Sequence, residues 1–410
     1  MHQTEPGRPA VSWRSLGVLT LASIVIVFLG VRVLPPEKGF TDVVCYWSAA
    51  KLLASGQSPY DIEEQTRVQR QFGWDKEGPG LGIYDFLPYY YPPWFGFLWV
   101  SFLPLGFTAA KVAWFFLNVE GILVSGYLLK DVVPGVSRWM SVLLAALFVF
   151  SLVCVLLGQT AILIFLLAAL AWRLLDAGWD RSAGVALAWL TIKPQLTAVL
   201  LLALVLRLAL QRRWNALGAF FLTLAALALV STFVVPSWLF EMLQAPQKTP
   251  SPTEYYPWIG NTWFLMLKTL GVEGWPLWTL YLAVALPFLG AVIRAALSPA
   301  QSTLDLVAVG LQAAFFVAPY ARHYDFPVLL IPLLALLRGR PASLAANLLL
   351  LALVFVPYVQ FYLLVQYKPL YNPSGLFLLE GTFFWIPVLL AVAWFALKRI
   401  PASADPAPLA

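Results

Sequence analysis

One carboxylate, Asp42, lies where the first apolar stretch of the chain ends and its most acidic segment begins. Eight of the 20 Asp and Glu residues fall between Glu37 and Asp85. Transfer of a sugar to a hydroxyl needs the hydroxyl proton to be removed as the bond forms, and a positioned carboxylate can accept it. We therefore take Asp42 as the candidate base of such a transfer at a membrane surface. The alternative is that Asp42, with Thr41, caps a helix that starts there.

Cations that could hold a phosphate leaving group stand in two other stretches. Lys193 lies within ALAWLTIKPQLTAVL, where burying a charge is costly, and it either contacts a phosphate or extends to the lipid headgroups. VAPYARHYDF brings Arg322 and His323 to the outer entrance of a predicted span, where a histidine can donate to a phosphate or orient an acceptor. His323 could instead be an interfacial residue paired with Asp325. Because phosphate departs as an anion, the transfer needs no general acid, and one carboxylate with cations is sufficient to catalyse it.

Contacts to the sugar or the acceptor are expected from Asp61, Gln159, Asn261, Tyr324 and Asp325. For Gln159 and Asn261 the alternative is that each satisfies a helix end. Asn118 and Glu120 fall inside an apolar stretch and are expected to bond within a helical bundle. A single carboxylate offers too few ligands for a metal ion, so we expect no metal and no cofactor.

The composition indicates that membrane-spanning helices position these residues. Only 11% of the residues are charged, against about 25% in soluble domains, and the mean hydropathy is +0.79. Apolar runs of about 15 to 22 residues predict an all-α, polytopic membrane protein. We predict about twelve spans, at 16–34, 109–129, 139–157, 160–175, 182–192, 195–211, 214–235, 275–296, 303–319, 323–337, 342–364 and 376–397.

The basic residues orient this topology. With the N-terminus inside, five Lys/Arg clusters fall on the cytoplasmic side, as the positive-inside rule requires. Both termini are then cytoplasmic, and the candidate site residues converge on the outer (periplasmic or extracellular) face of the cell membrane. The clusters are Lys130 with Arg138, Arg173 with Arg181, Arg207 with Arg212 and Arg213, Arg338 with Arg340, and Lys398 with Arg399.

Two segments depart from plain spans. Residues 92–107 are apolar but interrupted by Pro104 and Gly106, and we interpret them as interfacial or re-entrant. The spans 182–192 and 195–211 meet at Lys193–Pro194 and rise only about 16 to 25 Å, which would leave a cavity open at one leaflet.

The whole chain, 1–410, is interpreted as one membrane domain. Its first external loop, 35–108, is expected to carry interfacial helices, of which the one after Asp42 would lie flat on the bilayer. A second external loop covers 236–274, and 400–410 is expected to be a disordered tail.

Several function classes are excluded by what the sequence lacks. It has no Asp-x-Asp, P-loop or Gly-x-Ser-x-Gly motif and no histidine cluster. Cys45 and Cys154 give no disulfide framework. The net charge of +6 is the basic excess of a membrane protein rather than a nucleic-acid footprint. A sugar donor would have to come from the lipid.

Five stretches, in their order and spacing, resemble the integral-membrane glycosyltransferases of family 87, the polyprenyl-phosphate-mannose-dependent mannosyltransferase group of the type C (GT-C) superfamily. The similar stretches are TDVVCYWSAAKLLASGQSPYD, YYYPPWFGFLWVSFLPLG, LLGQTAILIFLLAAL, AGVALAWLTIKPQL and VAPYARHYDFPVLLIPLL.

The resemblance implies a GT-C-type fold and a polyprenyl-phosphate sugar donor used from the outer leaflet with inversion. It implies that Asp42 is the base, that Lys193–Pro194 matches the family's Lys-Pro, and that His323 matches its histidine before a late span. The expected partners are this donor, a lipid or glycan acceptor and membrane lipids, with no nucleic acid. The sugar expected from most members is mannose. Two departures from the common pattern are Ala318–Pro319 in place of Ser-Pro and Asn261–Thr262–Trp263 in place of Asn-x-Ser.

Two other functions fit parts of the pattern. A multi-span transporter or lipid flippase would explain twelve spans and interrupted helices, but it leaves the long external segment that begins near Asp42 unexplained. A ligase or polymerase of surface glycans would use the same site with a donor linked through pyrophosphate.

Overall fold

The computed structural model describes residues 12–33, 36, 41–73, 87–134, 137–248, 260–338, 344–366 and 381–398. The predicted tail at 400–410, residues 74–86 of the first external loop and residues 249–259 of the second lie outside the described residues. Within the described residues the chain is helical and contains no strand, which confirms the all-α prediction.

Four helices are long and apolar enough to cross a membrane: α1 (Trp13–Val33), α5 (Phe107–Leu128), α11 (Trp214–Val234) and α15 (Gly274–Leu297). A fifth candidate is the pair α6 (Arg138–Leu147) and α7 (Val149–Leu157), which meet at a bend of 57°. These counts refer to the described part of the chain. They confirm a multi-span membrane protein, whereas the figure of twelve crossings stays a prediction.

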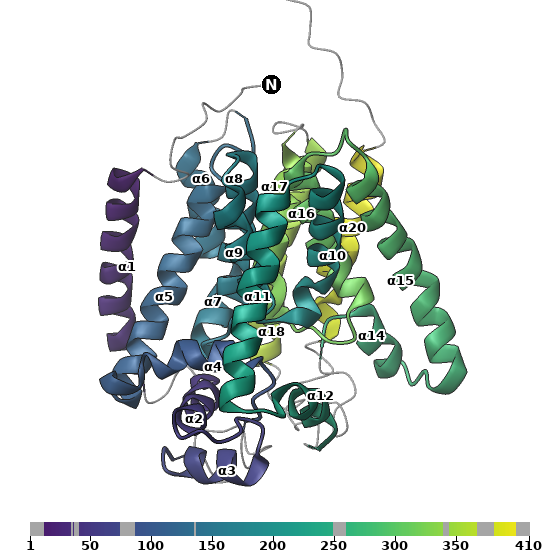
Figure 1. The fold of residues 1–410 in the computed structure, drawn as a ribbon. Helices are drawn as coiled ribbons and strands as arrows, with labels where there is room; N and C mark the ends of the chain where they lie inside the picture. Colours follow the sequence, from purple (N-terminus) through teal and green to yellow (C-terminus); the bar gives the residue numbers. More distant parts are fainter. Residues whose placement is uncertain are drawn as a thin grey trace, which may run out of the picture.

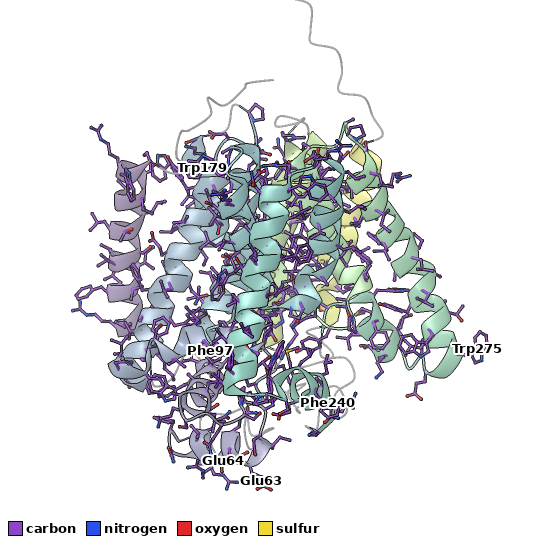
Figure 2. All side chains as sticks on the ribbon, in the orientation of Figure 1. Glu63, Glu64, Phe97, Trp179, Phe240 and Trp275 are labelled. Atoms are coloured by element: carbon purple, nitrogen blue, oxygen red, sulfur yellow. The ribbon has the colours of Figure 1, made fainter. Side chains whose placement is uncertain are left out.

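Helices also occupy the other predicted span ranges. They are α8 (Ala161–Asp176), α9 (Asp180–Leu190), α10 (Pro194–Leu210), α16 (Thr303–Val317), the 3₁₀ helix η2 (His323–Leu329) followed by α17 (Leu330–Leu337), α18 (Leu344–Gln366), and η4 (Thr382–Phe384) followed by α20 (Trp385–Lys398). Trp179 and Trp275 lie at opposite ends of this bundle and are exposed (Figure 2), as is typical of the aromatic belts at membrane interfaces.

Helix α1 stands at one edge of the bundle beside α5 (Figure 1), and polar side chains fasten it to α5. Glu120 of α5 accepts hydrogen bonds from Thr20 Oγ1 at 3.0 Å and from Ser23 Oγ at 2.6 Å. Ser15 and Tyr127 form a further bond of 2.7 Å between the same helices. Polar groups inside a membrane are expected to find such partners, so the bond within the bundle that was predicted for Glu120 is present.

The first external segment folds into α2 (Val43–Ala54), α3 (Ile62–Arg70), α4 (Pro93–Val100) and the 3₁₀ turn η1 (Leu103–Leu105). Ten of the twelve α2 residues are buried, so other segments of the chain cover the helix after Asp42, and its orientation flat on the bilayer stays a prediction. A helix that is apolar all round is covered all round. The Tyr46 ring, for example, packs against Phe95, Trp99 and Trp114.

Residues 92–107 do not form a full-length span. The eight residues of α4 rise only about 12 Å, and the chain then turns at Gly106, whose φ of +77° is readily adopted by glycine. This geometry fits the interfacial or re-entrant interpretation. Figure 1 shows α4 at the same end of the molecule as α2, α3, α12 (Trp238–Lys248) and α14 (Trp263–Thr269).

Candidate functional site

Asp42 stands directly before α2 but does not cap it with its side chain. Its backbone N–H donates to the carbonyl of Leu157, the last residue of α7, at 3.0 Å. The carboxylate accepts from Thr41 Oγ1 at 3.0 Å and from Gln159 Nε2. No α2 backbone N–H is bonded to the carboxylate. The capping alternative is therefore wrong for this side chain, which is held between two polar partners instead.

Gln159 reaches Asp42 because the chain reverses just before it. Gly158 ends α7 in the left-handed region, with φ of +75°. The Gln159 amide then donates to Asp42 while its oxygen accepts from Tyr91 Oη at 3.4 Å. The Gln159 side chain thus binds other side chains, while its backbone N–H donates to the Cys154 carbonyl at the end of α7 at 2.9 Å. Its contact with Asp42 joins two of the predicted site residues.

Tyr91 is a member of this cluster that the sequence did not single out. Its hydroxyl lies 3.4 Å from Tyr46 Oη and 3.5 Å from Thr160 Oγ1, and its carbonyl accepts from Tyr60 Oη at 2.8 Å. The run Tyr89–Tyr91 before two prolines was the available signal. Three successive tyrosines alone do not tell which hydroxyl turns toward Asp42.

Two opposing influences set the acidity of Asp42. Burial raises the pKa of its carboxyl group above the ordinary value, because a charge is costly in a poorly solvated place. Hydrogen bonds from Thr41 and Gln159 and the positive charges of Arg322 and Lys193 oppose that rise. The raised pKa makes Asp42 a stronger base, and both candidate cations act on it electrostatically.

Lys193 lies in the break between α9 and α10, and Pro194 is the first residue of α10. Its Nζ is 2.5 Å from Asp325 Oδ1, and the two side chains are only 3% and 0% exposed. The alternative in which Lys193 extends to the headgroups is therefore wrong. The other carboxylate oxygen of Asp325 accepts the Arg322 backbone N–H at 3.0 Å. Asp325 thus links the α9–α10 break to the loop that carries Arg322.

The Tyr324 ring is close to both cations. The centre of this ring is 5.0 Å from Lys193 Nζ and 5.2 Å from Arg322 Cζ, both within the range of a cation–π interaction. Tyr324 is buried, whereas Arg322 is only half-buried. Arg322 is therefore the more accessible cation for an incoming anion.

His323 faces an aromatic cluster. Its ring centre lies 6.2 Å from that of Phe150, 5.7 Å from Phe361 and 5.8 Å from Phe383. The carboxylate of Asp325, its predicted alternative partner, is bonded to Lys193 and to the Arg322 N–H. Binding of phosphate by His323 stays a prediction.

The remaining two candidates have different surroundings. Asp61 is exposed, and its carboxylate caps α3 by accepting the Glu64 N–H at 3.1 Å. Within the described residues no contact joins Asp61 to Asp42. Asn261 is buried and donates its backbone N–H to Ala321 at 2.7 Å, which places it against the loop that carries Arg322. Thr262, rather than Asn261, caps α14.

The cluster as a whole combines two carboxylates, Asp42 and Asp325, with two cations from three distant parts of the sequence. Among the described residues, no group of three or more His, Cys, Asp or Glu side chains could hold a metal ion. A base beside fixed positive charge can remove a proton and stabilise a departing anion. That pairing is the chemistry of a group transfer.

Comparison with known proteins agrees with this chemistry. The sequence profile of glycosyltransferase family 87 matches residues 89–319, more than half of the chain. The matched region contains Tyr91, Gln159, Lys193 and Asn261, while Asp42 precedes it and Arg322 follows it. No curated protein and no solved structure gives a significant match. The chain belongs to glycosyltransferase family 87.

Proposed function

We propose that this membrane glycosyltransferase moves a sugar, mannose, from a polyprenyl-phosphate donor to a lipid or glycan acceptor at the outer face of the membrane. The observation that carries the proposal is the environment of Asp42. Its carboxylate is held by Thr41 and Gln159 instead of capping α2, and Arg322 and Lys193 act on it electrostatically.

In the proposed reaction Asp42 accepts the proton of the acceptor hydroxyl. The oxygen of that hydroxyl bonds to the anomeric carbon at the same time. The bond between that carbon and the phosphate oxygen breaks, and the lipid phosphate leaves as an anion. Asp325 is committed to Lys193 and to the Arg322 N–H, so Asp42 is the carboxylate left for the acceptor. A single displacement of this kind inverts the anomeric centre.

The departing phosphate would be held mainly by Arg322. A guanidinium can bind two phosphate oxygens at once, and Arg322 is half-buried whereas Lys193 is buried. Lys193 has further N–H groups besides the one directed to Asp325 and adds positive charge 5.0 Å from the centre of the Tyr324 ring. Tyr91, Gln159 and Asn261 supply polar groups for the sugar or the acceptor.

The outer location rests on the distribution of charge. Arg207 and Arg294 lie near the ends of α10 and α15, opposite the end formed by α2, α3 and α12 (Figure 1). The positive-inside rule would place these basic ends in the cytoplasm. The Asp42 site would then face outward, where a lipid-linked donor can supply the sugar.

The proposal is tested with purified protein in lipid, radiolabelled polyprenyl-phosphate-mannose and a membrane glycolipid extract. Wild type should move the label to a new lipid or glycan with inversion, and Asp42→Asn should not, although both bind the donor. Equal transfer by Asp42→Asn would remove Asp42 from the chemistry. Movement of intact donor across the bilayer without a covalent product would favour a transporter instead.

A further inference from the structure

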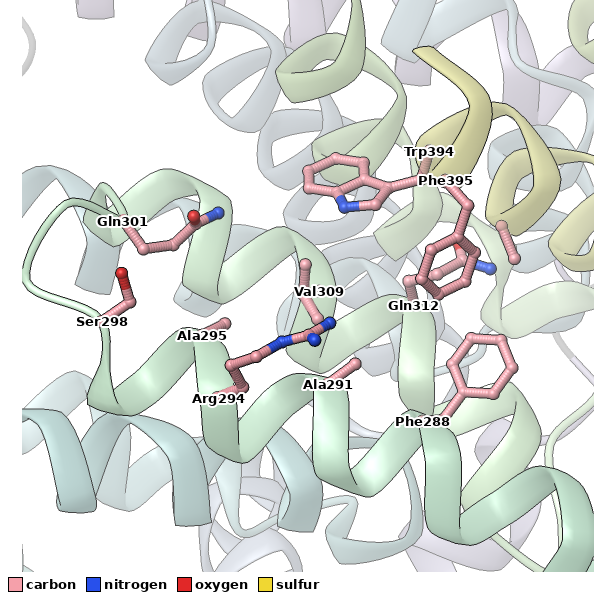
Figure 3. Close-up of a pocket in the computed structure, with 11 residues that line it drawn as sticks. Phe288, Ala291, Arg294, Ala295, Ser298, Gln301, Val309, Gln312, Trp394 and Phe395 are labelled. Atoms are coloured by element: carbon pink, nitrogen blue, oxygen red, sulfur yellow. The ribbon is translucent and has the colours of Figure 1, made fainter. Parts of the chain in front are cut away.

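A cavity of about 470 Å³ lies between α15, α16 and α20 (Figure 3). Trp275, near the start of α15, stands at the end of the molecule that also carries α3 (Figure 2). The cavity is lined by the last turns of α15, so it lies toward the opposite end from the Asp42 site. Its walls are mainly apolar, with Phe288, Ala291, Val309, Trp394 and Phe395 among them. The volume falls within the range of about 300 to 1,000 Å³ usual for ligand sites.

Arg294, an exposed residue, provides the charge among the residues that line the cavity. Figure 3 shows its side chain running toward Ala291, away from the end of α15 at Ser298, as helical side chains point toward the helix N-terminus. Arginines near the ends of membrane helices usually extend outward to the headgroups. Among the described residues the Arg294 guanidinium forms no hydrogen bond or ion pair. An anion would therefore be favoured beside it.

Gln312 gives a second, independent indication of a ligand. It lines the same cavity and is 5% exposed. Its Nε2 donates to the Pro387 carbonyl at 2.7 Å, but its Oε1 has no hydrogen-bond partner within the described structure. A buried acceptor without a donor is costly. A ligand that brings both an anion and a hydroxyl group would satisfy Arg294 and Gln312 together.

The neighbouring arginine cannot take this role, because its donors are already used. Arg207 of α10 binds the carbonyls at the end of α15, those of Ala295, Ala296 and Ser298, at 2.5 to 2.7 Å, and that of Gln301 at 3.0 Å. These bonds fasten the turn between α15 and α16 and fix the polar rim of the cavity. Arg294 is left as the cation that faces the cavity.

We infer that this cavity binds an anionic phospholipid, at a site separate from that of the sugar donor. The phosphate would pair with Arg294, a headgroup hydroxyl would donate to Gln312 Oε1, and an acyl chain would pack on Phe288, Trp394 and Phe395. The combination of one cation, one unsatisfied acceptor and apolar walls matches a phospholipid better than a free phosphate, which has no apolar part.

The test uses the full-length protein in detergent, titrated with phosphatidylglycerol while bound lipid is counted by native mass spectrometry and thermal stability is recorded. Arg294→Gln should weaken binding by about tenfold or more, because a hydrogen bond to a charged group is lost. Arg181→Gln is the matched control, since Arg181 is exposed on α9 and does not line the cavity. Ala291→Phe narrows the cavity without removing charge and should also abolish the tight site.

The arms of the experiment separate the possible occupants. Binding and stabilisation by phosphatidylglycerol in wild type and Arg181→Gln, but not in Arg294→Gln or Ala291→Phe, would support the site. Equal binding by all four proteins would overturn it in favour of general lipid coating. If only Arg294→Gln lost phosphatidylglycerol binding, the lipid would be attracted to the charge at the surface and would not occupy the cavity. That result would also overturn the proposal. An equal effect of inorganic phosphate, or displacement of lipid by a second copy of the chain, would contradict the choice of a phospholipid.

Discussion

Asp42 and Asp61 occupy the same position in two successive helices, each directly before the first helical residue. Asp61 is exposed and caps α3 through the Glu64 N–H. The Asp42 carboxylate accepts hydrogen bonds from Thr41 and Gln159, and burial raises its pKa. The difference teaches that a carboxylate at the N-terminus of a helix acquires its role from the segments that contact it, here the end of α7 and Gln159, rather than from its helix.

The largest effect is expected from the buried ion pair beside Asp42. Lys193→Met leaves the Asp325 carboxylate uncompensated, which should destabilise the fold by about 3 to 5 kcal/mol and abolish transfer. Lys193→Met combined with Asp325→Asn removes the stranded charge and should recover much of the thermal stability but not the transfer. Lys51→Met, at a half-buried lysine of α2, serves as the control. Full transfer activity of the double variant would show that the Lys193–Asp325 pair has no role in the reaction.

A smaller effect is expected when Gln159 is changed to alanine. Gln159 donates to ionised Asp42 and so opposes the rise of its pKa, and its loss should raise that pKa further. Because the base works only when ionised, kcat falls as the pH falls through this pKa. The acid limb of the kcat profile should therefore move to higher pH in Gln159→Ala and stay in place in Gln57→Ala, at an exposed glutamine. If the acid limb of the Gln159→Ala profile stayed at the wild-type pH, Gln159 would have no influence on the pKa of the base.

Substitution of Asp61, the carboxylate that caps α3, should lower stability and leave transfer nearly unchanged. Asp61→Ala removes the bond to the Glu64 N–H and should cost about 1 kcal/mol of stability, seen as a slightly lower melting temperature. Transfer should continue at nearly the wild-type rate. Asp61→Asn, which keeps a capping oxygen, should restore the melting temperature. A marked loss of transfer in both variants would give Asp61 the sugar or acceptor role first expected of it.

The smallest effect is expected at His323. Its ring packs among Phe150, Phe361 and Phe383, so His323→Phe should keep both packing and most of the activity. His323→Ala should lower the melting temperature. A strong rise in the donor KM for His323→Phe, with stability unchanged, would reinstate the histidine as a phosphate ligand.

Much of this site could be read from local patterns. Asp42, Lys193 and Arg322 were recognisable because each is a charge at the edge or in the middle of an apolar stretch, where charge is costly. The all-helical architecture and the break at Pro194 followed from hydropathy and from the chemistry of proline. The bonding of Glu120 within the bundle followed from the same argument.

The rest depended on contacts between distant segments. Tyr91 joins the cluster only because α4 packs on α2, and the burial of α2 has the same cause. The aromatic surroundings of His323 come from α7, α18 and η4, which no short pattern connects. Glu64, three residues after Asp61, is a local sign of a helix cap that Asp42 lacks, but no local pattern shows that Thr41 and Gln159 bind the Asp42 carboxylate.

The most direct test is a single-turnover measurement with donor-loaded protein. Wild type, Asp42→Asn and Asp61→Asn would be loaded with labelled polyprenyl-phosphate-mannose, mixed with acceptor, and followed for the labelled product. The account predicts similar donor binding in all three, normal transfer by Asp61→Asn, and transfer slowed by about 10² to 10⁴ in Asp42→Asn, the usual contribution of a general base. Equal rates in Asp42→Asn and wild type would contradict it.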